Sequence, residues 1–352
     1  MNTDWKKFVV THKESIRSTM EVINESSSQI ALVVVDEYRL VGAVTDGDIR
    51  RAILKGIGLQ EPVDKIMNKT PVSVLHDKPS EDIFLLMKQK GVKHVPVVDE
   101  RGIIKEVHSI KDFLTTSIYE NWVIIMAGGL GSRLAPLTND CPKPMLKIGD
   151  KPILEIIVEG LRKQNFKNIF ISVNYKSSQI KEYFGDGNGY GVTINYIDEE
   201  KALGTAGALN LLPEKPDIPF IVINGDLLSN VNFTNILDFH VEHEGDMTVC
   251  VKEYDFEVPY GVLNVDNYLI NSIEEKPVYT FFVNSGIYCL DPACVDFIPN
   301  NEFIDMTTLL KQIKENGKKV CAFPIVEYWL DVGRLSDFEK ANKDFPYKGI
   351  DR

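Results

Sequence analysis

The stretch VIIMAGGLGSRLAPLTNDCPKPML, residues 123–146, decides the fold of the larger part of this chain. A short apolar run comes first, and a run of this kind is typical of a buried strand. Glycines follow it directly, and glycines let backbone N–H groups lie close to phosphate oxygens. The glycines are Gly128, Gly129 and Gly131, and the cations after them are Arg133 and Lys143. The stretch therefore predicts a strand that leads into a phosphate-binding loop.

Two common phosphate-binding patterns do not fit this loop. A Walker loop that begins at Gly128 needs its second glycine at position 133, where the chain has Arg133. A dinucleotide fingerprint on Gly129 and Gly131 needs a third glycine at position 134, which is Leu134. A tight turn without a ligand would leave the two cations unexplained. A loop stiffened by three prolines and carrying two cations fits a triphosphate better.

The sequence around the loop alternates apolar strands with helices. This pattern predicts a mostly parallel sheet covered on both faces, with ligands at the carboxyl ends of its strands. The expected strands cover residues 123–127, 168–174, 193–198 and 220–226, and the expected helices cover residues 153–164, 177–184, 205–212 and 234–243. Three later segments, residues 247–254, 260–266 and 282–290, are typical of antiparallel additions that form a lid or a substrate wall.

The first third of the chain contains an internal repeat. Both copies run strand, Asp-Glu turn, strand, hydroxyl residue, aspartate and helix. Asp36 recurs 63 residues later as Asp99, and Thr45 recurs 64 residues later as Ser109, so the second copy is one residue longer. Repeats of this size that pair strands with helices normally pack on each other.

Length and charge limit the possible classes of protein. The 352 residues are too many for one ordinary core, and we expect domains at residues 1–120 and 121–352. The first holds 17 basic and 18 acidic residues and the second 22 and 33, which argues against nucleic acid as a partner. No apolar run is long enough to cross a membrane. The five cysteines form no C-x-x-C pair, which favours reduced thiols and a cytoplasmic protein.

The repeat resembles a tandem pair of cystathionine-β-synthase (CBS) modules over roughly residues 8–118. The segment VGAVTDGDI, residues 41–49, carries that family's Gly-x-x-Thr-x-x-Asp signature. The second copy departs from it, with Lys105 expected where the first has Gly42. The resemblance implies an adenine nucleotide between the modules and a homo-oligomer formed through their helices. The residues implied for the nucleotide are Thr45, Asp48, Ser109 and Asp112. Helix capping alone is the alternative role for these residues.

The glycine loop matches the pattern G-G-x-G-[ST]-R-L-x-P-L-T-x-x-x-P-K-P-M-L almost completely and so resembles the sugar-1-phosphate nucleotidyltransferases. The segments LGTAGAL, NGDLL, PYGVL, EEKP, FVNSGIY and WLDVG follow in that family's order, between residues 122 and 344. The resemblance implies a Rossmann-like, mostly parallel mixed sheet of GT-A type. The expected fold class is therefore α/β, with a tandem CBS module of βαβ type followed by a nucleotidyltransferase domain.

The resemblance implies attack by a sugar-1-phosphate oxygen on the α-phosphorus of a nucleoside triphosphate, with release of pyrophosphate. The attacking phosphate is already ionised, so positioning, cations and metal are expected to carry catalysis. Arg133 suits the leaving phosphates and Lys143 the α-phosphate. Asp226 and Asp331 are expected to hold Mg²⁺, with a helix cap and a turn as the alternatives. The nucleotide-binding residues implied are Ala127, Gly128, Gly129, Gly131, Ser132, Arg133, Lys143, Glu199, Gly204 and Asp226.

The sugar phosphate is assigned by resemblance to a second group of residues. Lys276 in EEKP would grip the sugar phosphate, Glu275 and Asn284 would bond sugar hydroxyls, and Gly261 would line the pocket. A polar turn is the alternative for each of them taken singly.

The choice of base depends on Glu199. Gly204 would pass its backbone under the base, and Glu199 stands where the family reads the base edge. A carboxylate only accepts hydrogen bonds, and guanine offers two adjacent donors, whereas uracil and thymine offer one. Glu199 therefore favours GTP, and a solvated acidic side chain is the alternative.

Several functions remain open at this point. The whole architecture is similar to the CBS-containing glucosamine-1-phosphate guanylyltransferases of bacterial legionaminic acid synthesis, which is the source of the sugar assignment. Heptose or mannose 1-phosphate, and transfer from UTP, dTTP or CTP, are alternatives within the same fold. A GT-A glycosyltransferase would normally show Asp-x-Asp, whereas this chain has the single Asp226. A non-catalytic nucleotide sensor is the third class.

Overall fold

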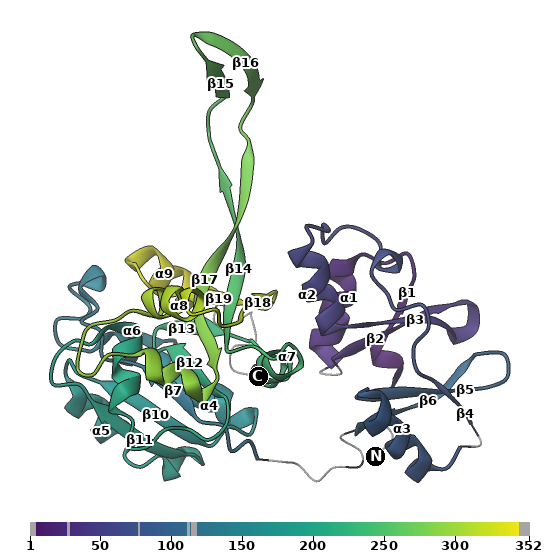
Figure 1. Cartoon of the computed structure of the whole chain (residues 1–352), viewed down its shortest axis with the longest axis horizontal. Coiled ribbons are helices and arrows are strands. Elements are labelled where there is room, and N and C mark those ends of the chain that lie inside the picture. Colours follow the sequence, from purple (N-terminus) through teal and green to yellow (C-terminus); the bar gives the residue numbers. More distant parts are fainter. Residues whose placement is uncertain (1–4, 27–28, 77, 111–112, 114–117, 345–352) are drawn as a thin grey trace. The chain divides into compact units, whose positions relative to one another are not determined.

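The computed structural model describes residues 5–26, 29–76, 78–110, 113 and 118–344 (Figure 1). The chain divides into two compact units, Met1–Ser117 and Ile118–Arg352. No helix among the described residues is long and apolar enough to cross a membrane.

The first unit consists of two small α/β modules. Each has a three-stranded sheet with one parallel and one antiparallel pair, in the orders β1-β2-β3 and β4-β5-β6. The elements are β1 (Val9–Thr11), α1 (Ile16–Ser26), β2 (Ile30–Val35), β3 (Arg39–Thr45), α2 (Asp46–Leu54), β4 (Val74–Leu75), α3 (Ser80–Lys90), β5 (His94–Val98) and β6 (Ile104–Ser109). The repeat found in the sequence is thus a repeat of structure.

A bulge at the same place in both modules corrects one detail of the sequence alignment. The ladder skips one residue between Val33 and Val34 in the first module, and between Val97 and Val98 in the second. Gly42 pairs with Val33, and Glu106, not Lys105, pairs with Val97. The bulge absorbs one residue, so an alignment carried over from the turn is shifted by one.

The second unit is built on a seven-stranded mixed sheet in the order β11-β10-β7-β12-β17-β14-β18. The first four strands are parallel to one another, β17 is antiparallel to both of its neighbours, and β18 is parallel to β14. The strands are β7 (Val123–Met126), β10 (Asn168–Val173), β11 (Thr193–Asp198), β12 (Phe220–Asn224), β14 (Met247–Glu257), β17 (Val278–Leu290) and β18 (Val320–Ile325). The expected mostly parallel sheet is therefore confirmed.

Helices cover both faces of this sheet because successive residues of its strands point to opposite sides. Ile125 belongs to a core that includes side chains of α4, α5, α7 and α9, whereas Ile124 belongs to a second core with α6 and α8. These helices are α4 (Ile153–Lys163), α5 (Ser177–Phe184), α6 (Gly204–Gly207), α7 (Phe233–Glu242), α8 (Met306–Glu315) and α9 (Leu335–Asp344). The helix expected over residues 205–212 is only the short α6, followed by a 3-10 turn.

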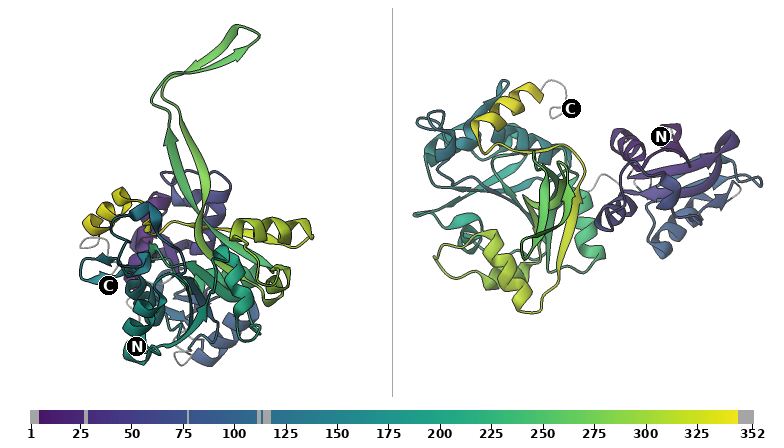
Figure 2. Two further views of the ribbon diagram at one scale, coloured as in Figure 1. Left: turned by 90° about the vertical axis from the view of Figure 1, so that its left-hand side faces the viewer. Right: turned by 90° about the horizontal axis from the view of Figure 1, so that it is seen from above.

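The antiparallel additions form a projecting arm. Strands β14 and β17 pair without interruption from Val251↔Asn284 to Glu257↔Val278. Beyond them the hairpin β15 (Val262–Asp266) and β16 (Leu269–Glu274) forms the tip. Figures 1 and 2 show this ribbon leaving the second unit and standing clear of its sheet and helices.

Candidate active site

The glycine loop lies where the order of the sheet reverses. Strand β7 is flanked by β10 on one side and β12 on the other, so the chain leaves β7 at a switch point between parallel strands. Ligands of open α/β sheets bind at such points. The Ala127 N–H donates to the Ser172 carbonyl at 2.9 Å, which fixes the start of the loop against β10.

Gly131 is needed for the shape of the loop. Its φ is +65°, and an added Cβ would lie 2.9 Å from Lys143 Cβ and 3.0 Å from Thr138 Cγ2. The Thr138 hydroxyl donates to the Gly131 carbonyl at 3.0 Å. The absence of a side chain at Gly131 thus lets the segment with Lys143 pack directly on the loop.

The turn before α5 anchors the middle of this segment. The Tyr175 hydroxyl and the Lys176 ammonium both donate to the Asn139 carbonyl, at 3.1 and 2.7 Å. The Gln179 amide donates to the Asp140 carbonyl at 2.9 Å. These bonds hold the connection between Arg133 and Lys143 on the body.

Lys143, Asp226 and Asp331 form the charged centre of the site. The ammonium of Lys143, which is only 8% exposed, donates to Asp226 and lies 3.9 Å from Asp331 Oδ1. Asp226 follows β12, at the same edge of the sheet as the glycine loop. Burial raises the pKa of Asp331, as does the nearby Asp226 carboxylate, whereas Lys143 and Arg133 lower it.

A small antiparallel ladder brings the two aspartates together. Strands β13 (Leu227–Ser229) and β19 (Trp329–Asp331) pair so that Asp331 stands opposite Leu227. The Val332 N–H donates to the Asp226 carbonyl at 3.1 Å. Two carboxylates far apart in the sequence thereby face one lysine.

The donor set fits a hard divalent cation. Asp226 Oδ1, Asp331 Oδ1 and Asn224 Oδ1 are buried oxygens without a hydrogen-bond partner in the structure. Within the described ranges, no three His, Cys, Asp or Glu side chains gather as a metal cage. Two carboxylates without a full cage suit an ion that keeps waters and binds substrate phosphates, as Mg²⁺ does.

Glu199 lies against the glycine loop and is not a solvated side chain. An added Cβ at Gly128 would be 2.5 Å from Glu199 Oε1. The Ser172 hydroxyl donates to Oε1 at 2.5 Å and the Leu203 N–H donates to Oε2 at 3.0 Å. The carboxylate is therefore oriented by its own chain beside the loop.

The segment that begins at Gly204 packs on the start of α8. Gly204 has φ +78°, and an added Cβ would lie 2.6 Å from the Ile304 carbonyl. Asp305 Oδ1 accepts from the Thr205 N–H at 3.1 Å, and the Thr205 hydroxyl accepts from the Met306 N–H at 2.9 Å. This packing sets the position of the chain that follows Glu199.

The residues expected at the sugar phosphate separate into two places. Asn284 lies at the base of the arm, where its side chain accepts from the Gly286 N–H at 3.0 Å and donates to the Tyr288 hydroxyl at 2.7 Å. Gly261 and Glu275 lie together on the arm, since an added Cβ at Gly261 would be 3.1 Å from Glu275 Oε2. Lys276 follows Glu275 in the turn before β17.

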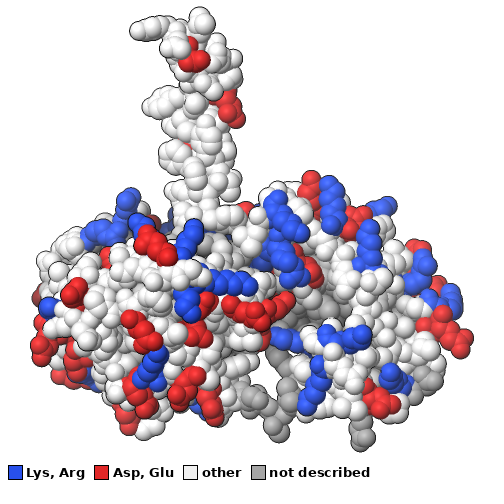
Figure 3. Space-filling view, in the orientation of Figure 1, with Lys and Arg blue, Asp and Glu red and all other residues white. Residues whose placement is uncertain are grey.

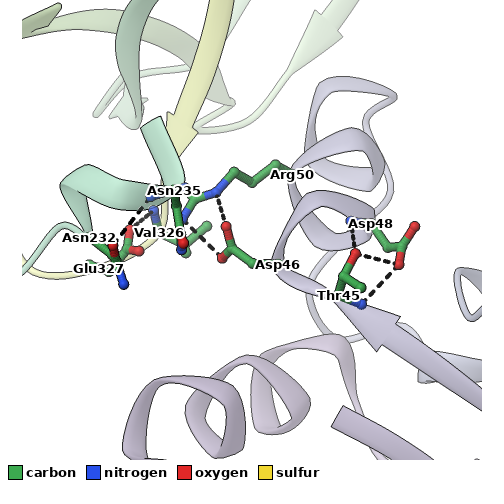
Figure 4. Close-up of polar contacts among 8 residues, drawn as sticks. All are labelled: Thr45, Asp46, Asp48, Arg50, Asn232, Asn235, Val326 and Glu327. Atoms are coloured by element: carbon green, nitrogen blue, oxygen red, sulfur yellow. Dashed lines mark hydrogen bonds and ion pairs between the residues drawn. The ribbon is translucent and has the colours of Figure 1, made fainter. Parts of the chain in front are cut away.

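In the first unit, Thr45 and Asp48 form a complete capping box at the start of α2 (Figure 4). The Asp48 N–H donates to Thr45 Oγ1 at 3.2 Å, and Asp48 Oδ2 accepts from the Thr45 N–H at 2.8 Å. Arg51 also pairs with Asp48, at 2.6 Å. Ser109 is the last residue of β6, and Asp112 lies outside the described residues. The capping alternative is therefore confirmed for the first module.

Several residues of these sites have no signal in the sequence. Ser172 and Asp305 orient Glu199 and the Gly204 segment, yet they are single polar residues without a motif. In the first unit, a hollow of about 730 Å³ is lined mainly by residues 71–79, with Leu86. The apolar and proline-rich run PVSVLHDKP could have drawn attention to it.

Comparison with known proteins places both parts of the chain. A nucleotidyl transferase family model matches residues 122–347, and a CBS domain model matches residues 3–55 and 63–115. Mannose-1-phosphate guanyltransferase from Debaryomyces hansenii is 35% identical over 61% of this chain and 62% of that protein. UTP–glucose-1-phosphate uridylyltransferase from Synechocystis sp. is 33% identical over 62% of this chain and 61% of that protein. The chain thus spans about three fifths of the curated relatives it matches.

Solved structures resemble the second unit. HddC from Yersinia pseudotuberculosis is 31% identical, with a TM-score of 0.52, over 64% of this chain and 99% of that one. HddC complexed with GMP-PN is 30% identical, with a TM-score of 0.51 and the same coverage.

Proposed function

Because the chain belongs to the nucleotidyl transferase family and carries tandem CBS domains at its N-terminal end, we propose that it is a sugar-1-phosphate nucleotidyltransferase. It would transfer a nucleoside monophosphate from a nucleoside triphosphate to a sugar 1-phosphate and release pyrophosphate. The observation that carries the proposal is the cluster of Lys143, Asp226 and Asp331 beside the glycine loop.

The chemistry follows from this arrangement. The sugar phosphate oxygen attacks the α-phosphorus in line with the leaving pyrophosphate, so the site has to hold two anions and stabilise the charge that develops. Lys143 is buried and held by Asp226, so its charge is fixed in place before the substrate binds. Arg133 is exposed on the loop and can follow the β- and γ-phosphates. Mg²⁺, held by Asp226 and Asp331, would offset phosphate charge.

We propose GTP as the nucleotide. Each Glu199 oxygen accepts one hydrogen bond from the chain, so each keeps a lone pair for a donor of guanine. The relatives include a protein named as a guanyltransferase and a structure with GMP-PN, although another relative is named as a uridylyltransferase. For the acceptor we propose a hexosamine 1-phosphate, in particular glucosamine 1-phosphate for legionaminic acid synthesis, with mannose 1-phosphate as the alternative.

A pyrophosphate-release screen tests the function. The full chain with MgCl₂ is assayed with GTP, UTP, dTTP and CTP against glucosamine, mannose and glucose 1-phosphates. We expect the fastest turnover with GTP, and at least about 100-fold less with Lys143→Ala. Release of a nucleoside diphosphate instead of pyrophosphate would indicate a glycosyltransferase, and no turnover with any pair would leave a nucleotide sensor.

We propose that the CBS unit regulates this reaction by binding an adenine nucleotide. The hollow along residues 71–79 offers Val72, Val74 and Leu75 to a base and Lys78 to a phosphate. Titration calorimetry of the full chain with AMP and ATP tests it, and no heat with either would contradict it. The five free cysteines support a cytoplasmic location, and helix contacts between CBS units are proposed to form an oligomer.

A further inference from the structure

The arm of the second unit, residues 254–282, exposes far more apolar surface than a free ribbon tolerates. Its large apolar side chains are 40–99% exposed, with Tyr268 at 99% and Tyr260 at 74%. The others are Tyr254, Phe256, Leu263, Val265, Leu269, Ile270, Ile273, Val278, Tyr279, Phe281 and Phe282. Figure 3 shows the arm almost without charged side chains, in contrast to the body below it.

This surface is large enough for a specific interface. Thirteen side chains of this size leave on the order of 1,000 Å² of apolar area on one arm. Monomeric proteins expose contiguous apolar patches of only about 300–600 Å², and each partner of a stable interface buries roughly 800 Å². A two-stranded ribbon is also marginal in water by itself. Another surface therefore has to cover the arm.

The tip carries the groups that the active site lacks. Lys276 is the only basic residue between positions 254 and 282, and five acidic residues share the arm with it. Among the described residues, neither Lys276 nor Glu275 makes a hydrogen bond or an ion pair. On the body, Lys143 is occupied by Asp226. The site thus lacks a cation for its second anion, the sugar phosphate, and the arm holds one without a partner.

The path of the arm separates it from its own site. Strands β14 and β17 stay hydrogen-bonded from the edge of the sheet to Glu257↔Val278, so the ribbon would have to break this ladder to fold back. A second copy of the chain has the same open site and the same arm, and exchange of identical elements closes both at once.

We propose that two copies of the chain exchange arms, so that Lys276 and Glu275 of each arm complete the sugar-phosphate site on the partner's body. This inference rests on the proposed function, because it assigns Lys276 to the acceptor of that reaction. The apolar side chains of the arm provide the binding energy, and Lys276 provides the missing cation. Each active site is then composite, and a single chain binds the nucleotide but not the sugar phosphate efficiently.

Mixing two inactive variants tests the proposal. Asp226→Asn removes a carboxylate of the body, and Lys276→Ala removes the cation of the arm. In a mixed dimer with exchanged arms, the body of the Lys276→Ala chain receives an intact arm and forms one complete site. Coexpression is expected to restore about a quarter of wild-type pyrophosphate release, since half of the dimers are mixed and each has one complete site. The matched control is Asp226→Asn with Lys143→Ala, which leaves both bodies defective and should restore nothing.

The other outcomes overturn the proposal in distinguishable ways. No restoration with an inactive Lys276→Ala means that the arm serves its own chain, and full activity of Lys276→Ala means that the arm has no role. A wild-type chain without turnover refutes the proposed function, and arm docking is then judged by amide hydrogen exchange. Residues 262–274 should be protected increasingly as protein concentration rises, and protection independent of concentration contradicts exchange.

Discussion

At the scale of single residues, Glu199 decides between nucleotides. Glu199→Gln replaces one acceptor oxygen with an NH₂ donor, which would face the donors of guanine. The ratio of kcat/KM for GTP to that for UTP should therefore fall by about 10-fold or more, since leaving a buried donor unpaired costs on the order of 1–3 kcal/mol. Steady-state kinetics with both nucleotides measure it. An unchanged ratio would remove Glu199 from base recognition.

His240 makes the second unit sensitive to acid. Burial lowers its pKa, although Asp291 and Asp246 raise it in part, and its Nδ1 lies 2.9 Å from the Thr248 hydroxyl. The unfolded chain therefore binds a proton near the ordinary histidine pKa of about 6.5, before the folded chain does. Stability is full above that pH and is lost as the pH falls towards the lowered pKa.

The variant His240→Gln should remove this contribution. Its melting temperature should fall less than that of the wild type between pH 7.5 and pH 5.5, while other acid-sensitive groups affect both proteins equally. Differential scanning calorimetry at both pH values measures the difference, and His12→Gln is a control for a histidine without a resolved shift. Equal losses in wild type and His240→Gln would contradict the argument.

At the scale of elements, the glycine loop offers a matched pair of substitutions. Gly131→Ala places a side chain at φ +65° and within 3.0 Å of two neighbours, so the segment with Lys143 has to move. We expect kcat to fall by about 100-fold or more, because displacements of the order of 1 Å have effects of this size. Gly129→Ala has nothing within 4 Å and should change stability by less than about 1 kcal/mol.

Thermal melting together with pyrophosphate release distinguishes the two variants. If Gly129→Ala is folded and Gly131→Ala is folded but inactive, the loop acts by positioning Lys143. Equal activity of Gly131→Ala and wild type would show that the loop adapts.

The same scale shows what sequence can predict here and what it cannot. Strands β7, β10, β11 and β12 were predictable because each is a continuous apolar run with its own boundaries. The pairing of β13 with β19 was not, because three-residue strands far apart in the chain carry no periodicity, and this pairing places Asp331 beside Asp226. The motif EEKP was visible, but its place on an arm depends on how far β14 and β17 stay paired.

At the scale of the whole molecule, exchange of arms links activity to concentration. If a single chain lacks Lys276 at its sugar-phosphate site, specific activity should decline on dilution as dimers dissociate. The double variant Tyr260→Ser/Ile273→Ser weakens the apolar contact of the arm without touching Lys276. It should shift the dilution curve to concentrations at least about 10-fold higher, since these side chains are 74% and 68% exposed and each contributes about 1 kcal/mol or more when covered.

The control for this shift is Leu211→Ser, which removes a 40% exposed apolar side chain from the body of the same unit. Specific activity is measured from nanomolar to ten-micromolar enzyme at saturating GTP, and sedimentation velocity follows the oligomer over the same range. The curve of Leu211→Ser should coincide with that of the wild type. A CBS contact alone would keep dimers together but would leave the arm variant indistinguishable from the wild type, so the displacement of its curve separates exchange of arms from association through the first unit.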